Sequence, residues 1–310
     1  MDVLRETNFS FLGPRTAGKV RDIYKRDGEL VLVTTDRHSS FDRIIAHIPW
    51  KGQVLNQVSA WWFDKTKDIV PNHVLAIPDP NVTIAKKCAM VPVEAVVRGY
   101  LTGVTDTAAW TRYAAGVRSF GGIVLPENMR KNQKLPQPIF DPTTKEAQHD
   151  RVLSPEQMMA EGFITRDLFD RLRRTALALF DRGQKLAERN GLILVDTKYE
   201  FGTGADGSLV LIDEIHTPDS SRYWQLDSYA ARFATGEEPH YFDKEFLRLW
   251  FRDHCDPYRD ATLPPAPPEL VQELSRRYIA MYEQITGMKF EYGETPILPR
   301  IEKNLRSYGL

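Results

Sequence analysis

The sequence has few cysteines, no long hydrophobic run and no recognisable export signal. Its two cysteines, Cys88 and Cys255, stand far apart, which gives no metal-binding spacing and indicates a reducing compartment. No run of about 18 apolar residues occurs, so we expect no membrane-spanning helix. The N-terminus, MDVLRETNFSFLG, lacks the basic and apolar regions of a secretory signal. These absences predict a cytoplasmic protein, and an organelle stays open as the alternative if a transit segment precedes the sequence.

An excess of charge of either sign is also absent. The chain has 41 lysines and arginines against 42 aspartates and glutamates, for a net charge of −1. Because nucleic-acid-binding chains usually carry a clear basic excess, we expect no nucleic-acid partner. The 310 residues, 42% of them apolar and 27% charged, are typical of a globular protein with two domains, or one large domain with subdomains. The expected partners are small molecules.

The most informative stretch runs from residue 192 to residue 224. Its first part, LILV, predicts a buried strand, and the continuation DTKYEFG alternates charged with uncharged residues. Because side chains alternate faces along a strand, Asp196, Lys198 and Glu200 are predicted to share one face. The turn ending in Asp206-Gly207 predicts a hairpin, whose second strand, residues 209–212, delivers Asp213 beside Glu200.

Two readings of this charged face are open from the residues alone. Alternating charge is what the solvent-facing side of an antiparallel sheet also shows. Against that, apolar strands lead into the charges, and the next segment, TPDSSR, is dense in hydroxyl and charged groups. Carboxylates on neighbouring strands suit Mg²⁺ when the phosphates of a nucleotide supply the remaining ligands.

A second hairpin is predicted near the N-terminus. GKVRDIY and ELVLVTT are β-rich runs separated by the turn residues Asp27-Gly28. Gly18 and Lys19 stand at its entry, where backbone N–H groups and an ammonium can approach phosphates. The pattern GxxxxGK[ST] does not occur, so a plain surface hairpin remains the alternative.

Polar segments after other apolar runs supply further candidates. The segment from Thr35 to Arg43, which contains Ser40, is interpreted as a polar loop at the end of a strand. Arg98 follows a strand over residues 91–97, where a guanidinium can grip phosphate or carboxylate or form a structural ion pair. Residues 116–138 read as a long loop, and Lys145 lies in another. His149 is assigned no chemistry, because a lone histidine is more often a hydrogen-bonding residue.

Helices are predicted between these segments by their periodicity and their end signals. Apolar spacing predicts a helix over residues 50–68 and another that contains Phe246 to Trp250. Ser154 and Thr165 are predicted to cap two helices, the second ending at Asn190-Gly191. A last amphipathic helix is predicted over residues 270–285, after the proline cluster 264–268. The tail 291–310 carries no chemical signal.

With these motifs in place, the chain resembles the SAICAR synthetase family. The resemblance is carried by GKVRDIY, TDRHSSFD, VPVEAVVRGYLTG, PTTKEAQHD, LVDTKYEFG and IDEIHTPDSSRYW, in one consistent order from residue 18 to residue 224, and DKEFLRLWF extends it. DTKYEFG together with DEIHTPDSSR is the most specific part. GKVRDIY alone carries little.

The resemblance implies a ligase that uses ATP to join L-aspartate to carboxyaminoimidazole ribotide (CAIR). It implies an α+β fold with mostly antiparallel sheets. Residues 1–90 would form a kinase-small-lobe-like subdomain that binds ATP, residues 91–238 an ATP-grasp-like catalytic domain, and residues 239–310 a helical region packed on the core. Phosphorylation of a carboxylate needs Mg²⁺ and basic groups around the phosphoryl group. No obligatory protein partner is expected.

Residue by residue, the match implies roles in binding ATP, Mg²⁺ and the substrate and in catalysis. ATP would be contacted by the N-terminal hairpin and one further lysine, Mg²⁺ by two carboxylates, and CAIR by a mixed charged set. The assigned residues are Gly18, Lys19, Arg21 and Lys145 for ATP, Glu200 and Asp213 for Mg²⁺, Arg98, Ser40, Asp196, Lys198 and Arg222 for the substrate, and Lys198 and Asp196 for catalysis.

One position departs from the family pattern. The family motif RGYLTGS ends in serine, whereas this chain has Val104, so Thr102, Thr105 or a backbone N–H would replace that hydroxyl.

Two other functions compete with the ligase. A kinase-like phosphotransferase would suit the hairpin and the paired acids, but the HRD and DFG motifs are absent. A non-catalytic nucleotide sensor would need a broken site, whereas Lys19 and both carboxylates are present.

Overall fold

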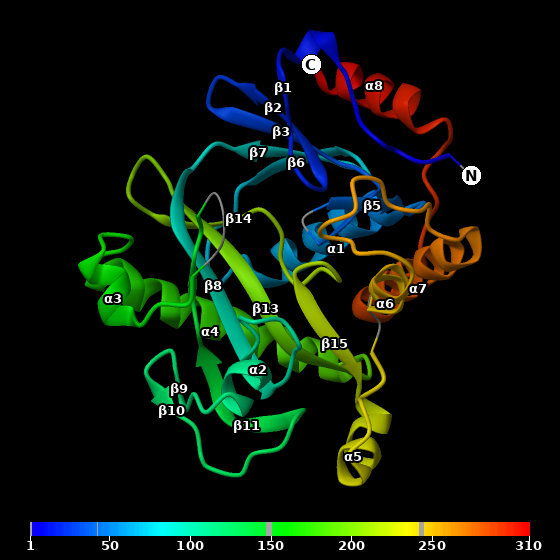
Figure 1. The fold of residues 1–310 in the computed structure, drawn as a ribbon. Coiled ribbons are helices and arrows are strands. Elements are labelled where there is room, and N and C mark those ends of the chain that lie inside the picture. The colour runs from blue at the N-terminus through cyan, green and yellow to red at the C-terminus, as the bar shows by residue number, and fades with distance from the viewer. Residues whose placement is uncertain (1, 42, 147–150, 242–244) are drawn as a thin grey trace. The chain divides into compact units, whose positions relative to one another are not determined.

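The computed structural model describes residues 2–41, 43–146, 151–241 and 245–310. The chain divides into two compact units (Figure 1). The first contains Met1–Trp61, His73–Lys87 and Phe242–Leu310, and the second contains Trp62–Asn72 and Cys88–Tyr241. Both combine helices with antiparallel strand pairs, which confirms the predicted α+β class with mostly antiparallel sheets. The predicted boundaries at residues 90 and 238 stay predictions.

The sheet of the first unit has five antiparallel strands in the order β1-β2-β3-β7-β6. The predicted N-terminal hairpin is β2–β3, with Gly28 at φ +73° in its turn. The prediction of a loop from Thr35 to Arg43 is wrong. Arg37–Ser40 is a strand that pairs with β5 and is mostly buried. The strands are β1 (Arg15–Ala17), β2 (Arg21–Arg26), β3 (Glu29–Thr34), β4 (Arg37–Ser40), β5 (Arg43–His47), β6 (Val74–Asp79) and β7 (Val82–Lys86).

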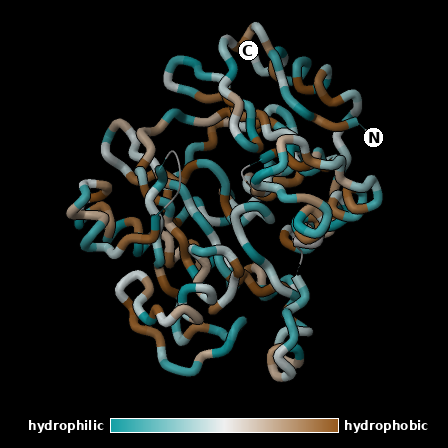
Figure 2. Tube along the Cα trace, viewed as in Figure 1, coloured by the Kyte–Doolittle hydropathy of each residue, from teal (hydrophilic) through white to brown (hydrophobic). Residues whose placement is uncertain are grey.

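The helices of this unit include one that the sequence reading missed. In α8, Ile297, Ile301 and Leu305 recur every four residues and pack into the core of the five-stranded sheet. The trace of α8 alternates accordingly between hydrophobic and hydrophilic residues (Figure 2). Arg300 anchors the helix through Nε and Nη2 to Asp79 at 3.0 and 3.1 Å. The helices are η1 (Ser10–Leu12, a 3₁₀ turn), α1 (Lys51–Thr66, which runs on into the second unit), α6 (Glu245–His254), α7 (Pro268–Thr286) and α8 (Ile297–Tyr308).

The second unit is built on a six-stranded sheet with β8 and β13 at its centre. The order is β11-β8-β13-β14, with β12 paired to β8 and β15 to β13. The predicted hairpin is β13–β14, in which Glu200 pairs with Ile212 immediately before Asp213. The strands are β8 (Ala89–Leu101), β9 (Ser119–Phe120), β10 (Ile123–Val124), β11 (Gln133–Phe140), β12 (Thr143–Thr144), β13 (Leu192–Thr203), β14 (Leu209–Ile212) and β15 (Ser221–Gln225).

Helix α4 covers one face of this sheet and leaves the other face for charged residues. Its apolar stripe packs on β8 and β13 (Figure 1). Gly99 of β8 permits this close approach, because an added Cβ would lie 3.2 Å from the ring of Phe180. The helices are α2 (Ala109–Ala114), α3 (Pro155–Ala160, with Ser154 in a capping box), α4 (Arg166–Arg189, capped by Thr165) and α5 (Leu226–Thr235).

Strand β11 corrects the prediction of a long loop over residues 116–138. Its prolines, Pro136 and Pro138, argue against a central strand because proline donates no ladder hydrogen bond. The structure places β11 at the edge of the sheet, where that loss is tolerated. Strand β8 likewise runs beyond the predicted 91–97, so Arg98 lies within it. Among the described residues, no helix is long and apolar enough to cross a membrane.

Candidate functional site

The charged face of the second unit is organised by β13. Asp196, Lys198 and Glu200 are half-buried on one side of this strand, whereas Thr197, Tyr199 and Phe201 are buried on the other. The predicted alternation is therefore confirmed. Successive charged residues lie about 7 Å apart along the strand. The sheet neighbours of each one define three rows of side chains across this face.

The first row joins three strands at Asp196. In register, Asp196 pairs with Arg98 of β8 and with Arg222 of β15. Arg222 donates from Nη1 to Asp196 Oδ2 at 2.9 Å, and its side chain remains 33% exposed. Arg98 is 9% exposed and donates from Nε to Asp141 Oδ2 at 2.8 Å and from Nη2 to the carbonyl of Thr107 at 3.0 Å. Arg98 thus sits in an internal ion pair, and Arg222 is the more accessible guanidinium.

The second and third rows bring two glutamates and two lysines together. Glu200 pairs in register with Glu94 of β8. Two carboxylates directly opposite each other would repel, and each has a lysine beside it. Lys198 donates from Nζ to Glu94 Oε1 at 2.5 Å, and Lys145 contacts Glu200. Thr143 Oγ1 also donates to Glu94 Oε2, at 3.3 Å.

This environment shifts the protonation of both Glu200 and Lys198. Burial, followed by the negative charge of Asp213, raises the pKa of Glu200 above its usual range. Partial burial alone would lower the pKa of Lys198, but the neighbouring carboxylates, Glu94 foremost, outweigh it and raise that pKa. Lys198 is therefore a permanent cation near neutral pH. Glu200 has a carboxylate whose charge a further cation would stabilise.

The donor set of this face suits a hard divalent cation that brings ligands of its own. Among the described residues, no group of three or more His, Cys, Asp or Glu forms a metal site. Glu200 and Asp213 are close enough for the charge of Asp213 to act on Glu200. Two carboxylate oxygen donors are too few for a self-contained cage, and they match Mg²⁺ bound jointly with phosphate oxygens.

Asp213 begins a turn that a buried histidine holds against the back of β13. Asp213 and His216 both have left-handed backbones, with φ of 66° and 49°. The Nε2 atom of His216 lies 2.5 Å from the hydroxyl of Tyr199, and its carbonyl accepts from the hydroxyl of Tyr223 at 2.8 Å. Complete burial lowers the pKa of His216 to about 3, so the ring is neutral. The turn that carries the carboxylate of Asp213 is thus anchored to β13 and β15 through His216.

The loop of the first unit presents a different arrangement. Gly18, Lys19 and Val20 connect β1 to β2, and Gly18 and Lys19 are exposed. The amide of Gly18 donates to the carbonyl of Arg21 at 2.7 Å, which closes the turn. Arg21 itself is the first residue of β2 and is half-buried. The loop therefore offers backbone groups and one ammonium rather than a row of charged side chains.

The remaining predicted residues have less complete surroundings. Ser40, the last residue of β4, is 8% exposed, and its Oγ has no hydrogen-bond partner in the described part of the chain. The segment that contains His149 lies outside the described residues. Val104 is 64% exposed after Gly103, whose φ is 100°. Thr102 donates its hydroxyl proton to Asn132 Oδ1 at 2.6 Å, so it is not a ready replacement for the missing serine hydroxyl.

Sequence reasoning missed two residues that shape the charged face, Glu94 and Asp141. Glu94 interrupts the apolar run VPVEAVV, and an acid on an inward-facing strand position was the signal. Asp141 accepts from both Arg98 and Arg112, the latter at 2.7 Å. Its link to Arg98 spans 43 residues and has no local signal.

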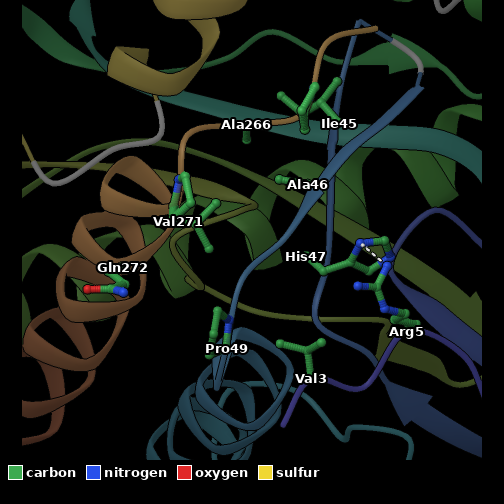
Figure 3. Close-up of a pocket in the computed structure, with 11 residues that line it drawn as sticks. Val3, Arg5, Ile45, Ala46, His47, Pro49, Ala266, Val271 and Gln272 are labelled. Atoms are coloured by element: carbon green, nitrogen blue, oxygen red, sulfur yellow. Dashed lines mark hydrogen bonds between the residues drawn. The ribbon is translucent and has the colours of Figure 1, made fainter. Parts of the chain in front are cut away.

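A cavity of about 440 Å³ lies elsewhere in the first unit, and none of the predicted site residues lines it. Its wall is mostly apolar, with Val3, Ile45, Pro49 and Val271 among the lining residues (Figure 3). At one end Arg5 Nη1 lies 3.4 Å from His47 Nδ1. The residues to which the sequence analysis assigns chemistry therefore lie outside this cavity.

Comparisons with known proteins identify the family. Residues 15–265 match the family described as SAICAR synthetase. A phosphoribosylaminoimidazole-succinocarboxamide synthase of Legionella pneumophila (strain Lens) is 55% identical over 307 residues, which cover 98% of each chain. The chloroplastic enzyme of that name from Arabidopsis thaliana is also 55% identical, over 97% of this chain and 75% of its own. The solved SAICAR synthase of Saccharomyces cerevisiae, complexed with SAICAR, is 32% identical, with a TM-score of 0.80 over 93% of this chain and 100% of its own. This chain belongs to the SAICAR synthetase family.

Proposed function

We propose that the protein joins L-aspartate to the carboxylate of CAIR, with ATP as co-substrate, and forms SAICAR, ADP and phosphate. This is the reaction of phosphoribosylaminoimidazole-succinocarboxamide synthase, a ligase of purine (IMP) biosynthesis. The single observation that carries it is the charged face of β13, where the arginine row at Asp196 adjoins the lysine–glutamate rows. The 55% identity to relatives of that name, over nearly the whole chain, supports it.

The chemistry explains why both cations and carboxylates are needed. A carboxylate oxygen is a poor leaving group, so one oxygen of CAIR attacks the γ-phosphorus and the bond to ADP breaks. The aspartate amine, after losing a proton, then attacks the carbonyl carbon. The carbon–oxygen bond breaks, phosphate leaves with its electron pair, and the nitrogen gives up a second proton to phosphate or water as the amide forms. Anionic charge collects on the phosphoryl oxygens in the first step, which is where positive groups accelerate transfer.

Each predicted residue has a role in this scheme. Lys19 and Lys145 hold the phosphates of ATP, while Gly18 and Arg21 shape the nucleotide loop. Lys145 is well placed for a shared role, because it also contacts Glu200. Glu200 and Asp213 would hold Mg²⁺, which when bound neutralises the phosphate oxygens during transfer. Burial and the charge of Asp213 raise the pKa of Glu200, and a bound cation would lower it again by stabilising the carboxylate.

The CAIR end of the site falls to the arginine row. Arg222 grips the phosphate or carboxylate of CAIR with parallel hydrogen bonds, and Asp196 orients its guanidinium. Lys198 keeps its proton and stabilises charge on the reacting carboxylate. Arg98 supports the row from β8, and Ser40 is the remaining substrate contact. A general base for the amine is not assigned, and positioning of the reactants supplies much of the rate.

The finer fold and cellular assignments are part of the same proposal. Residues 1–90 correspond to a kinase-small-lobe-like ATP-binding part, residues 91–238 to an ATP-grasp-like part and residues 239–310 to a helical region. The substrates are small molecules, and no protein or nucleic-acid partner is needed. We place the protein in the cytoplasm, although the plant relative is described as chloroplastic.

One assay separates the proposed ligase from its rivals. ADP release is measured with ATP and CAIR, in the presence and absence of L-aspartate, and the products are separated. The ligase forms SAICAR only with aspartate. A kinase-like phosphotransferase releases ADP at full rate without aspartate, and a nucleotide sensor releases none. Either of the last two results would overturn the proposal.

A further inference from the structure

Arg37 is buried in the first unit and points its guanidinium at the backbone of the nucleotide loop. Its side chain is 5% exposed. Nη2 donates to the carbonyl of Gly18 at 3.0 Å, and Nε donates to the carbonyl of Lys19 at 3.3 Å. Nη1 donates to the carbonyl of Arg5 at 2.9 Å, and Nη2 also donates to Asp22 Oδ1 at 2.9 Å. The loop carbonyls are thus fixed by a residue that is 18 or more positions away.

Thr35, two residues before Arg37, fixes the next carbonyl of the same loop. Its backbone N–H and its hydroxyl both donate to the carbonyl of Val20, at 2.9 and 2.6 Å. Three consecutive carbonyls, those of residues 18–20, are therefore drawn toward one segment of the chain. Because a trans peptide is planar, its N–H points opposite to its C=O. The N–H groups of Lys19 and Val20 accordingly point away from Arg37.

This orientation is what an anion requires. A carbonyl oxygen aimed at phosphate repels it, whereas successive N–H groups that converge on one side attract it. A guanidinium with three of its nitrogen atoms engaged on carbonyls and a carboxylate is poorly placed to bind phosphate itself. We propose that Arg37 is a positioning residue for the phosphates of ATP, which it serves by fixing the peptide orientation of residues 18–20. This inference rests on the proposed function, in which that loop binds ATP.

Asp22 keeps the guanidinium of Arg37 in place. Its carboxylate is fully buried and accepts from the amide and hydroxyl of Thr7, at 2.6 and 3.0 Å, and from Arg15 at 3.4 Å. Removing Arg37 outright would leave a buried carboxylate with part of its charge uncompensated. A lysine keeps the charge, but its three donors sit on a single nitrogen, so it lacks the fork with which Arg37 reaches four separate acceptors.

The test uses Arg37→Lys, with Arg15→Lys as the matched control. Arg15 is also bonded to Asp22, but it donates to the carbonyl of Thr7 and not to the loop carbonyls. We expect Arg37→Lys to weaken the binding of ADP and of inorganic tripolyphosphate, measured by calorimetry, by about tenfold each. The KM for ATP should rise by the same factor while the KM for CAIR is unchanged. Arg15→Lys should leave all of these values as they are.

Two further variants keep the outcome decisive. Thr35→Val removes one of the two hydrogen bonds to the Val20 carbonyl, and it should weaken tripolyphosphate binding about threefold even if Arg37→Lys fails to fold. Lys19→Ala tests the loop itself. Weaker nucleotide binding in Lys19→Ala, with unchanged binding in both Arg37→Lys and Thr35→Val, would overturn the role of Arg37 alone. Unchanged binding in Lys19→Ala as well as in both of these variants would instead remove the loop from the ATP site.

Discussion

The loop at residues 18–20 and the charged face of β13 both suit anions, but they use different parts of the chain. On the charged face, side chains are the candidate ligands: Lys198 and Glu200 project from β13, and Arg222 projects from β15. In the loop, the backbone is the candidate ligand, and the residue that orders it, Arg37, is buried beneath it. A charged side chain on a strand can be replaced with a local effect, whereas the loop depends on contacts made from far along the chain.

This difference bears on how each region tolerates substitution. The sheet face is held by the ladder hydrogen bonds of β8, β13 and β15, which do not depend on the identity of the charged residues. The loop conformation depends on a few specific donors. We therefore expect variants of the sheet face to keep their fold and lose chemistry, and variants beneath the loop to lose binding through geometry.

The largest effect is predicted for Glu200→Gln. The amide keeps the shape of the side chain but removes the charge that would hold Mg²⁺, so kcat should fall by roughly 100-fold or more. Glu161→Gln, which alters an exposed glutamate paired with Arg151 at 2.7 Å, is the control and should keep its activity. The measurement is the steady-state kcat of both variants and of the wild-type protein at saturating Mg²⁺. A near wild-type rate for Glu200→Gln would remove Glu200 from the metal site.

The two arginines of the first row should behave differently. Arg222→Lys should lower kcat/KM for CAIR by about 30- to 1000-fold, or roughly 2–4 kcal/mol, because a lysine lacks the forked donor pair. Its melting temperature should change little, since the Arg222 side chain is partly exposed. Arg98→Lys breaks a buried pair with Asp141 and should lower the melting temperature more. Equal losses of stability in both variants would contradict this distinction.

A smaller effect, on stability rather than turnover, is predicted for His216. Its folded pKa of about 3 lies below the ordinary value near 6.5, so the unfolded chain takes up the proton first as pH falls. The stability that neutral His216 contributes is therefore full above pH 6.5 and should fall by roughly 3 kcal/mol between pH 7 and pH 4. His216→Gln cannot titrate. Urea unfolding across this range should show a shallower pH dependence in the variant, and parallel curves would contradict the prediction.

The parts that the sequence predicted were those with local periodicity. The alternation in DTKYEFG placed Asp196, Lys198 and Glu200 on one face, and the Asp-Gly turn placed Asp213 next to Glu200. Capping residues and apolar spacing located α4 and α7. Each of these signals depends on neighbours within a few residues, which is the range over which strand and helix geometry acts.

The parts that were missed depend on long-range contacts. The segment TDRHSS reads as a loop because it is polar, yet most of it is buried, and its Arg37 is paired with Asp22 and with the loop carbonyls. Strand β11 tolerates its prolines only because it lies at a sheet edge. The carboxylate of Glu94 is paired with Lys198, which lies 104 residues away in the sequence. No window of local sequence contains these partners.

The central claim is that the loop acts on ATP and the arginine row of the sheet face acts on CAIR. The most direct test measures separate KM values for ATP and CAIR in Lys19→Ala and in Arg222→Lys. We predict crossed effects: Lys19→Ala raises the KM for ATP by about tenfold with little change for CAIR, and Arg222→Lys does the reverse. If both variants raise both constants by similar factors, the division of labour between the two regions is wrong.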